Sequence, residues 1–215
     1  MDMTEATLNV MPLPLASLER ELPRRRSHRA AIHAMRELAE SIDEKDSHTR
    51  AHSDRVAFYA AALAAAMGLG KERQTELMHA GRLHDVGKVG IPDRILLKPG
   101  RLTSEEFEIV KLHSAEGERR IAAIGEPEIA LWIRHHHERW DGRGYPDGLI
   151  GSTIPLESRI IAVADALDAM TTDRSYALGI GFGEAADEIE AHSGTQFDPA
   201  VAEAMVELIR TRPEA

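Results

Sequence analysis

The sequence predicts an all-α fold, a single bundle of helices. Alanine, leucine and glutamate are abundant among the 215 residues, whereas aromatic residues make up only 4 %. This balance favours helix over strand, and the length is sufficient for one domain with a substantial core. Apolar residues recur at helical spacing, and no strand-like alternation of useful length interrupts them.

The expected domain covers residues 27–212, after an irregular leader or linker over residues 1–26. Its first helix carries apolar residues at spacings of three and four, namely Ile32, Met35, Leu38 and Ile42. Further helices are expected over about 50–67, 71–87, 103–119, 127–139, 157–171, 183–193 and 199–211.

Local signals set several of these helix ends. The second helix is expected to stop near Gly68 or Gly70. Thr103 and Glu106 have the spacing of a capping box. Asp198 is the expected N-cap of the last helix, with a proline after it.

Residues 141–156 are glycine-rich and are expected to form a structured loop. The stretch contains four glycines and two prolines, which break helices and favour defined turns.

Composition and charge exclude several classes of function. The chain has no cysteine, so disulfides and thiolate metal sites are excluded, and any metal must be held by nitrogen and oxygen. A net charge of −10 argues against polymeric nucleic acid but leaves room for a small anion in a local positive pocket. No apolar run is long enough to span a membrane, and the start does not read as a signal peptide, so a cytoplasmic location is expected.

The placement of the eleven histidines predicts a metal site. His84 and Asp85 are adjacent and can reach one metal, while the second carboxylate oxygen of Asp85 can bridge to another. Lys88 follows on the same side and could hold a phosphate oxygen. The candidates on the expected helices are His48, His52, His79, His84, His113, His135, His136 and His137, with Asp85 and Asp165 among them.

Five segments resemble the motifs of HD-GYP domains, a branch of the HD superfamily of metal-dependent phosphohydrolases. They read HTRAHSDRV, LHDVGKVGIPDRILLKPGRLTSEEF, HHERWDGRGYPDGLIGSTIP, RIIAVADALDAM and TDRSY. The resemblance runs from about residue 27 to 210 and implies an HD-type helical bundle. The HHE…DG.GYP block separates this group from the broader HD phosphohydrolases, and GYP stands here as Gly144, Tyr145 and Pro146.

The resemblance implies two metal ions that share Asp85. It assigns the first metal to His52, His84, Asp85 and Asp165, and the second to Asp85, His113, His136 and His137. Lys88 matches a lysine near the bridging solvent and the phosphate, and Tyr145 and Arg174 match residues that contact a cyclic dinucleotide. His135 is an extra histidine beside the pair. Mixed imidazole and carboxylate ligands suit several transition metals, and the resemblance favours iron or manganese.

The implied activity is hydrolysis of cyclic di-GMP to pGpG and/or GMP by a metal-activated bridging hydroxide, with Asp85 and Lys88 as catalytic residues. Two alternatives stay open, a non-hydrolytic cyclic di-GMP receptor and a phosphodiesterase for another cyclic dinucleotide. The first helix could be the last part of a signalling or dimerising segment. A homodimer or an upstream regulatory domain is therefore a further possibility.

Two positions depart from the family pattern. Members with three metals carry a glutamate where His48 stands, and a neutral imidazole brings no charge to offset a third dication. The sequence therefore predicts two metals, with His48 not bound directly to either of them or held through a solvent molecule. Ala177 stands where members often carry a basic residue, which predicts weaker substrate binding.

Overall fold

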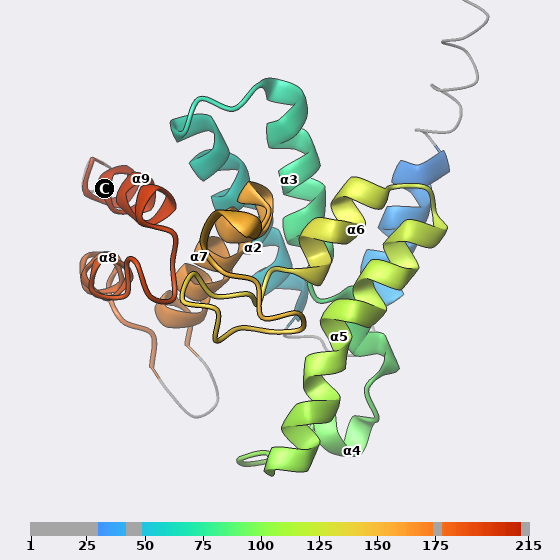
Figure 1. The fold of residues 1–215 in the computed structure, drawn as a ribbon. Coiled ribbons are helices and arrows are strands. Elements are labelled where there is room, and N and C mark those ends of the chain that lie inside the picture. Colours follow the sequence, from blue (N-terminus) through green and yellow to red (C-terminus); the bar gives the residue numbers. More distant parts are fainter. Residues whose placement is uncertain (1–29, 42–48, 174–177, 212–215) are drawn as a thin grey trace, which may run out of the picture.

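The computed structural model describes residues 30–41, 49–173 and 178–211, and it confirms the all-α fold (Figure 1). Within these ranges no strand occurs, and the only extended pairing is an isolated bridge between Ser193 and Phe197. A first helix covers residues 30–41. The others are α2 (Thr49–Ala66), α3 (Lys71–Leu83), the 3-10 helix η1 (Val86–Gly90), α4 (Asp93–Leu96), α5 (Ser104–Ala123), α6 (Pro127–Arg134), the 3-10 helix η2 (Gly151–Thr153), α7 (Leu156–Thr171), α8 (Phe182–Ala191) and α9 (Pro199–Arg210).

The core forms where α2 packs against α3 and α7, while α5 packs against α6 and η1. Helices α8 and α9 pack against each other and against α7. The apolar stripes of these helices meet in one continuous core, which stabilises the bundle by removing their side chains from water. Its fully buried members include Leu63, Leu77, Leu83, Ile121, Ile133, Ile160, Ile161, Leu167, Ile189 and Met205.

The predicted helix starts are confirmed by hydrogen bonds. Thr103 Oγ1 accepts from Glu106 N at 3.2 Å, and a carboxylate oxygen of Glu106 accepts from Thr103 N at 2.8 Å, which completes the capping box. Asp198 caps α9 by accepting from Ala200 N at 2.8 Å. The first helix buries Met35 as expected, whereas Ile42 lies outside the described residues.

Three predicted helix ends are wrong, and two of the errors fall at histidines. The helix expected over 71–87 ends at Leu83, and a turn and then η1 carry the chain onward. The helix expected over 127–139 ends at Arg134. The helix expected over 103–119 continues to Ala123. Helix α4 was also missed, because its four residues lie within a stretch rich in proline and glycine.

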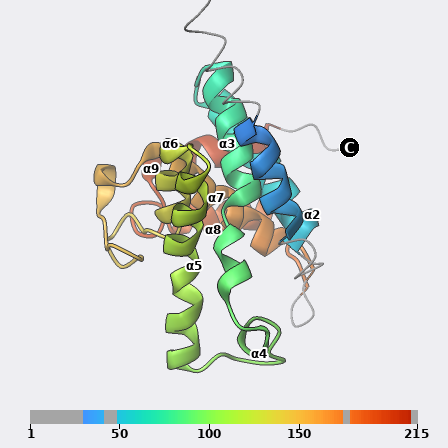
Figure 2. The same ribbon diagram turned by 90° about the vertical axis from the view of Figure 1, so that its right-hand side faces the viewer.

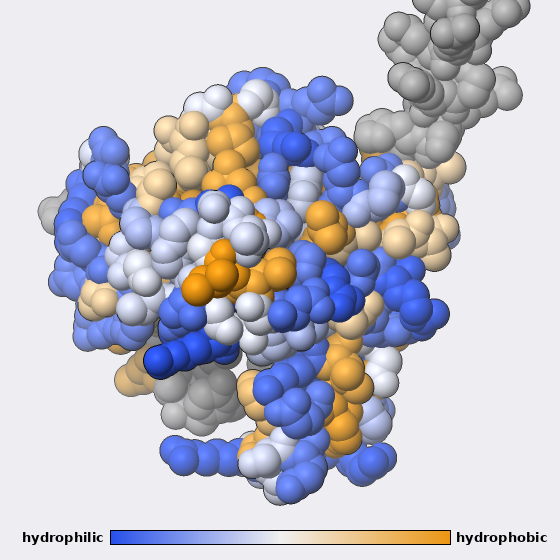
Figure 3. Space-filling model, viewed as in Figure 1, coloured by the Kyte–Doolittle hydropathy of each residue, from blue (hydrophilic) through white to orange (hydrophobic). Residues whose placement is uncertain are grey.

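The lower half of α5 and the short helix α4 project together beyond the bundle, as both views of the ribbon show (Figures 1 and 2). The face seen in Figure 3 is mostly hydrophilic, with small apolar patches. In the part of the chain that the structure describes, no helix combines the length and the apolar character needed to cross a membrane. The cytoplasmic location and the boundary near residue 26 stay predictions.

Candidate metal centre

The seven predicted ligands converge from five parts of the fold into two clusters. The open cluster consists of His52 on α2, His84 after α3 and Asp165 on α7. The buried cluster consists of Asp85 after α3, His113 on α5, and His136 and His137 after α6. Within each cluster, the candidate ligand atoms all lie within 4.8 Å of one another.

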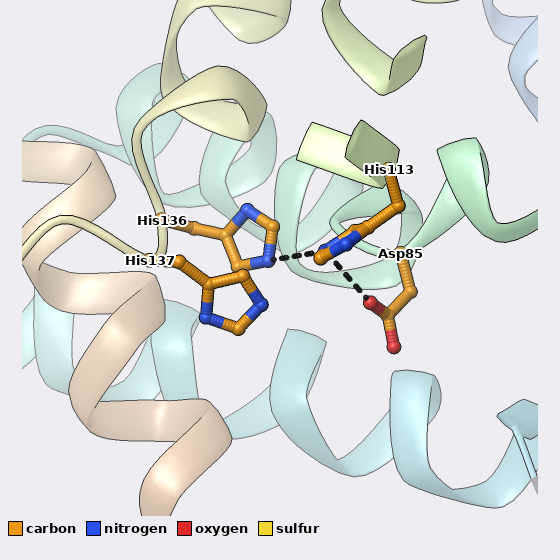
Figure 4. Close-up of side chains that lie close together, drawn as sticks. All are labelled: Asp85, His113, His136 and His137. Atoms are coloured by element: carbon orange, nitrogen blue, oxygen red, sulfur yellow. Dashed lines mark hydrogen bonds and ion pairs between the residues drawn. The ribbon is translucent and has the colours of Figure 1, made fainter. Parts of the chain in front are cut away.

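Asp85 lies between the two clusters with one carboxylate oxygen toward each. Its Oδ2 is 3.4 Å from His84 Nε2, and its Oδ1 is 3.4 Å from His113 Nε2. Figure 4 shows His113 between Asp85 and His136, and the Nε2 atoms of the two histidines are 3.4 Å apart. Donor atoms facing one another at such distances are arranged to share a cation rather than to pair among themselves.

The imidazole rings are oriented so that Nε2 faces the centre. In His84, His113 and His136, Nδ1 lies 2.7, 2.7 and 2.6 Å from the backbone carbonyl three residues earlier. A carbonyl only accepts, so each Nδ1 carries the proton and each Nε2 keeps its lone pair for a metal. The chemistry of this donor set fits divalent metal ions.

His52 is oriented by a carboxylate instead. Its Nδ1 lies 2.7 Å from Asp168 Oδ2, and its Nε2 lies 3.3 Å from Asp165 Oδ1 and 3.4 Å from His84 Nε2. Arg55 also donates to Asp168 through Nε and, at 3.1 Å, through Nη2. Although burial opposes it, hydrogen bonds from His52 and Arg55 lower the pKa of Asp168.

The roles of Asp168 and Arg55 were not predicted from the sequence. A signal was present, because Arg55 lies three residues after His52 and Asp168 lies three residues after Asp165. That spacing places each residue on the same helix face as a predicted ligand.

Burial sets the charge state of the buried histidines. It lowers the pKa of His136 well below the usual range, and burial together with His113 lowers that of His137 to about 3. Both rings therefore stay neutral, as metal ligands must be.

The neighbours of Asp85 keep its carboxylate ionised, and this negative charge attracts cations. Burial lowers the pKa of His84, but the Asp85 carboxylate outweighs it and raises the value to about 9 when no metal is bound. A metal ion at His84 Nε2 would take the place of this proton and pair with the same carboxylate. Burial opposes the ionisation of Asp85, yet Lys88 and His84 hold its pKa well below the usual range.

Lys88 lies beside the shared carboxylate, with its Nζ 2.5 Å from Asp85 Oδ2. The expected helix is absent here, but η1 still brings Lys88 to the predicted side. Gly87 explains how η1 approaches α5 so closely, because a Cβ on it would lie 1.8 Å from the carbonyl oxygen of His113.

The glycine-rich loop places Tyr145 against the buried cluster. The ring centroid of Tyr145 is 4.8 Å from that of His137 and 6.4 Å from that of His113. Gly144 lets the loop fold back, since a Cβ there would lie 2.4 Å from Arg139 N. Tyr145 is therefore positioned beside the clusters by the fold of the loop to which it belongs.

A buried carboxylate and a histidine hold the loop. Glu138 accepts from the backbone N–H groups of Asp147, Gly148 and Leu149 at 2.7, 3.0 and 3.1 Å. His135 Nε2 lies 2.8 Å from Asp147 Oδ2. The extra histidine, His135, therefore anchors the loop and belongs to neither cluster. The role of Glu138 was not predicted from the sequence.

The remaining predicted residues are not brought into the clusters. His79 on α3 belongs to neither. His48, Arg174 and Ala177 lie outside the described residues.

A family model described as HD domain matches residues 34–201 of the chain. The chain belongs to the HD domain family. A cyclic di-GMP phosphodiesterase of Thermotoga maritima is 46 % identical over 170 residues, which cover 76 % of this chain and 45 % of that protein. The cyclic di-GMP phosphodiesterase response regulator RpfG of Xanthomonas campestris pv. campestris is 40 % identical and is matched over 79 % of this chain and 46 % of its own length. The expected place among the HD-GYP members of the family is confirmed.

Solved structures of HD proteins share the fold. An HDG"Y"P protein from Bdellovibrio bacteriovorus superposes with a TM-score of 0.61 at 20 % identity, covering 77 % of this chain and 53 % of that one. The HD domain of the phosphodiesterase PgpH from L. monocytogenes gives a TM-score of 0.59 at 20 % identity, covering 81 % of this chain and 96 % of that one. The HD chain spans about half the length of the curated relatives it matches.

Proposed function

We propose that this HD-GYP chain hydrolyses cyclic di-GMP with two divalent metal ions, iron or manganese. The observation that carries the proposal is the position of Asp85, whose two oxygens face one cluster each at 3.4 Å. If Asp85 is shared, four side chains are available to coordinate each metal. The similarity to curated cyclic di-GMP phosphodiesterases supports the same activity.

Two such ions, when bound, polarise a phosphodiester and supply a nucleophile at neutral pH. The donor set of five imidazoles and two carboxylates leaves the loaded centre net positive. An anionic substrate is therefore attracted to it, although the chain as a whole is acidic.

The chain's own residues complete the site. Lys88 is proposed to stabilise charge on the non-bridging phosphate oxygens, because its ammonium lies at the shared carboxylate. Tyr145 is proposed to orient the substrate beside His137. Arg174 keeps its proposed role in holding the dinucleotide, and the proposed count of two metals keeps His48 away from direct coordination.

The test combines metal analysis with product analysis on protein purified without oxygen. We expect two metals per chain and conversion of cyclic di-GMP to pGpG or GMP, with both lost on chelation and restored by iron or manganese. His192→Ala is the matched control, since this exposed histidine lies on neither cluster. Tight binding of cyclic di-GMP by metal-loaded protein without any product would instead show a receptor.

A second substrate is a specific alternative. A Vibrio cholerae protein called 3'3'-cGAMP-specific phosphodiesterase 2 is 39 % identical, matched over 79 % of this chain and 33 % of its own length. A substrate panel with both dinucleotides decides between them through the ratio of their kcat/KM values.

A further inference from the structure

An exposed aromatic ring lies one step farther from the clusters than Tyr145. Phe107, near the start of α5, has 44 % of its surface exposed. Its ring centroid is 6.4 Å from that of Tyr145, which in turn is 4.8 Å from that of His137. The three rings therefore form a row that leads from the buried cluster to solvent.

A pair of opposite charges lies next to this ring. Lys111 Nζ is 5.1 Å from the ring centroid of Phe107 and 5.7 Å from that of Tyr145. The same Nζ is 2.6 Å from Glu108 Oε1. Lys111 has 30 % of its side chain exposed and Glu108 has 68 %, so both can exchange this contact for a ligand.

The pair presents a donor beside an acceptor, which is the complement of one edge of guanine. Guanine offers the acceptors O6 and N7, which lysine recognises, and its N1–H and N2–H groups donate beside O6. Adenine offers a donor where guanine has O6, so the same pair would leave polar groups unsatisfied. The partly exposed Phe107 ring supplies the stacking surface that a flat base needs once Lys111, which now lies over it, turns toward the edge of the base.

We infer that Phe107, Glu108 and Lys111 form a guanine-binding subsite for one base of the substrate. Phe107 stacks on the base, Lys111 donates to O6, and Glu108 accepts from N1–H and N2–H. The inference rests on the proposed function, because a phosphate at the clusters sets the position of the attached nucleoside. It adds a base-recognition role on α5 to a site otherwise built from metal ligands, Lys88 and the glycine-rich loop.

The stacking part is tested with Phe107→Ala on metal-loaded protein. Base–aromatic stacking predicts that KM and Kd for cyclic di-GMP rise about tenfold, with kcat nearly constant. Turnover of bis(p-nitrophenyl) phosphate, a diester without a base, should change much less. Phe107→Tyr keeps the ring and should restore binding, and Leu112→Ala, an exposed neighbour on α5, is the matched control.

The recognition part is tested with Glu108→Gln and Lys111→Met. Each should lower the preference for cyclic di-GMP over cyclic di-AMP by about tenfold, since a hydrogen bond to a charged group is lost. An unchanged preference in both variants would overturn the guanine assignment.

The outcomes separate this inference from the proposed function. If the wild-type chain hydrolyses cyclic di-GMP but Phe107→Ala binds it equally well, the subsite is wrong and the function stands. If Phe107→Ala impairs the base-free diester as strongly as cyclic di-GMP, the ring supports the metal centre and the subsite is wrong. If the wild-type chain neither binds nor cleaves cyclic di-GMP, both fail.

Discussion

The two clusters are built from similar ligands but are held in different ways. In the buried cluster, the side chains of His113 and Asp85 are 1 % and 4 % exposed, and backbone carbonyls orient His113 and His136. In the open cluster, a backbone carbonyl orients His84, but His52 and Asp165 are 16 % and 23 % exposed and a side chain, Asp168, orients His52. Backbone carbonyls are fixed by the helices, whereas a side-chain orienter can be removed by mutation. The open cluster should therefore be the one whose metal affinity depends on single residues outside its ligand set.

The largest effect is expected for Asp85→Ala, which removes the ligand that both clusters share. We expect most bound metal and all measurable hydrolysis to be lost, because each cluster loses a carboxylate and the two ions repel each other without it. Metal content by mass spectrometry and product formation are the readouts, with Asp187→Ala, an exposed acid that belongs to neither cluster, as control. Retention of both ions at wild-type occupancy would disprove the bridging role.

Lys88→Ala should separate metal binding from catalysis. Its ammonium contacts Asp85 and is proposed to act on the phosphate, so we expect both ions to be retained and kcat to fall about a hundredfold. Single-turnover rates and metal content measured on the same preparation test this. Loss of an ion would instead make Lys88 a structural partner of Asp85.

The seven predicted ligands lie within short motifs, and their coordination of metal stays a prediction. All seven ligand positions meet in the structure, and the two groups match the predicted assignment except that Asp85 is counted with the buried cluster. The all-α fold and the capping box at Thr103 were also predicted, since apolar spacing and capping are local properties of the chain.

What the sequence did not predict depends on contacts between distant segments. The helices before His84 and His135 end earlier than their patterns suggest, because a turn there lets neighbouring side chains face the centre. Asp168 and Glu138 act on partners 116 and 9 to 11 residues away, respectively. Gly87 and Gly144 look like ordinary loop glycines until the backbone that each one approaches is known.

Asp168→Asn tests the difference between the clusters directly. The amide keeps the shape of the side chain but loses the charge that holds His52 and Arg55. Removal of a carboxylate that orients a metal-bound histidine typically weakens metal affinity by about 10- to 100-fold. In Asp168→Asn we therefore expect the ion of the open cluster to be lost at a lower chelator concentration than in the wild-type chain, while the ion of the buried cluster is retained.

A comparison with Arg55→Lys identifies the cause. Lysine keeps the positive charge near Asp168 but cannot reproduce the two-point contact of arginine, so metal binding should weaken less than in Asp168→Asn. Thermal melting of each variant checks that the fold is intact. Simultaneous loss of both ions in Asp168→Asn would show that the clusters bind as one unit and would remove the distinction between them.

The smallest effect is expected for Glu138→Gln, which loosens the loop without touching a proposed ligand. The glutamine can still accept, but its amide nitrogen faces backbone donors where Glu138 now accepts from three N–H groups. Tyr145 depends on this loop, whereas His113 and His136 are oriented by backbone carbonyls on α5 and α6. We therefore expect KM for cyclic di-GMP to rise roughly fivefold, in keeping with the loss of about one hydrogen bond, while both ions stay bound. Metal content and KM measured on the same preparation distinguish a loosened loop from a lost metal ion. Loss of an ion from Glu138→Gln would show that the loop, through the contact between the rings of His137 and Tyr145, is part of the buried cluster.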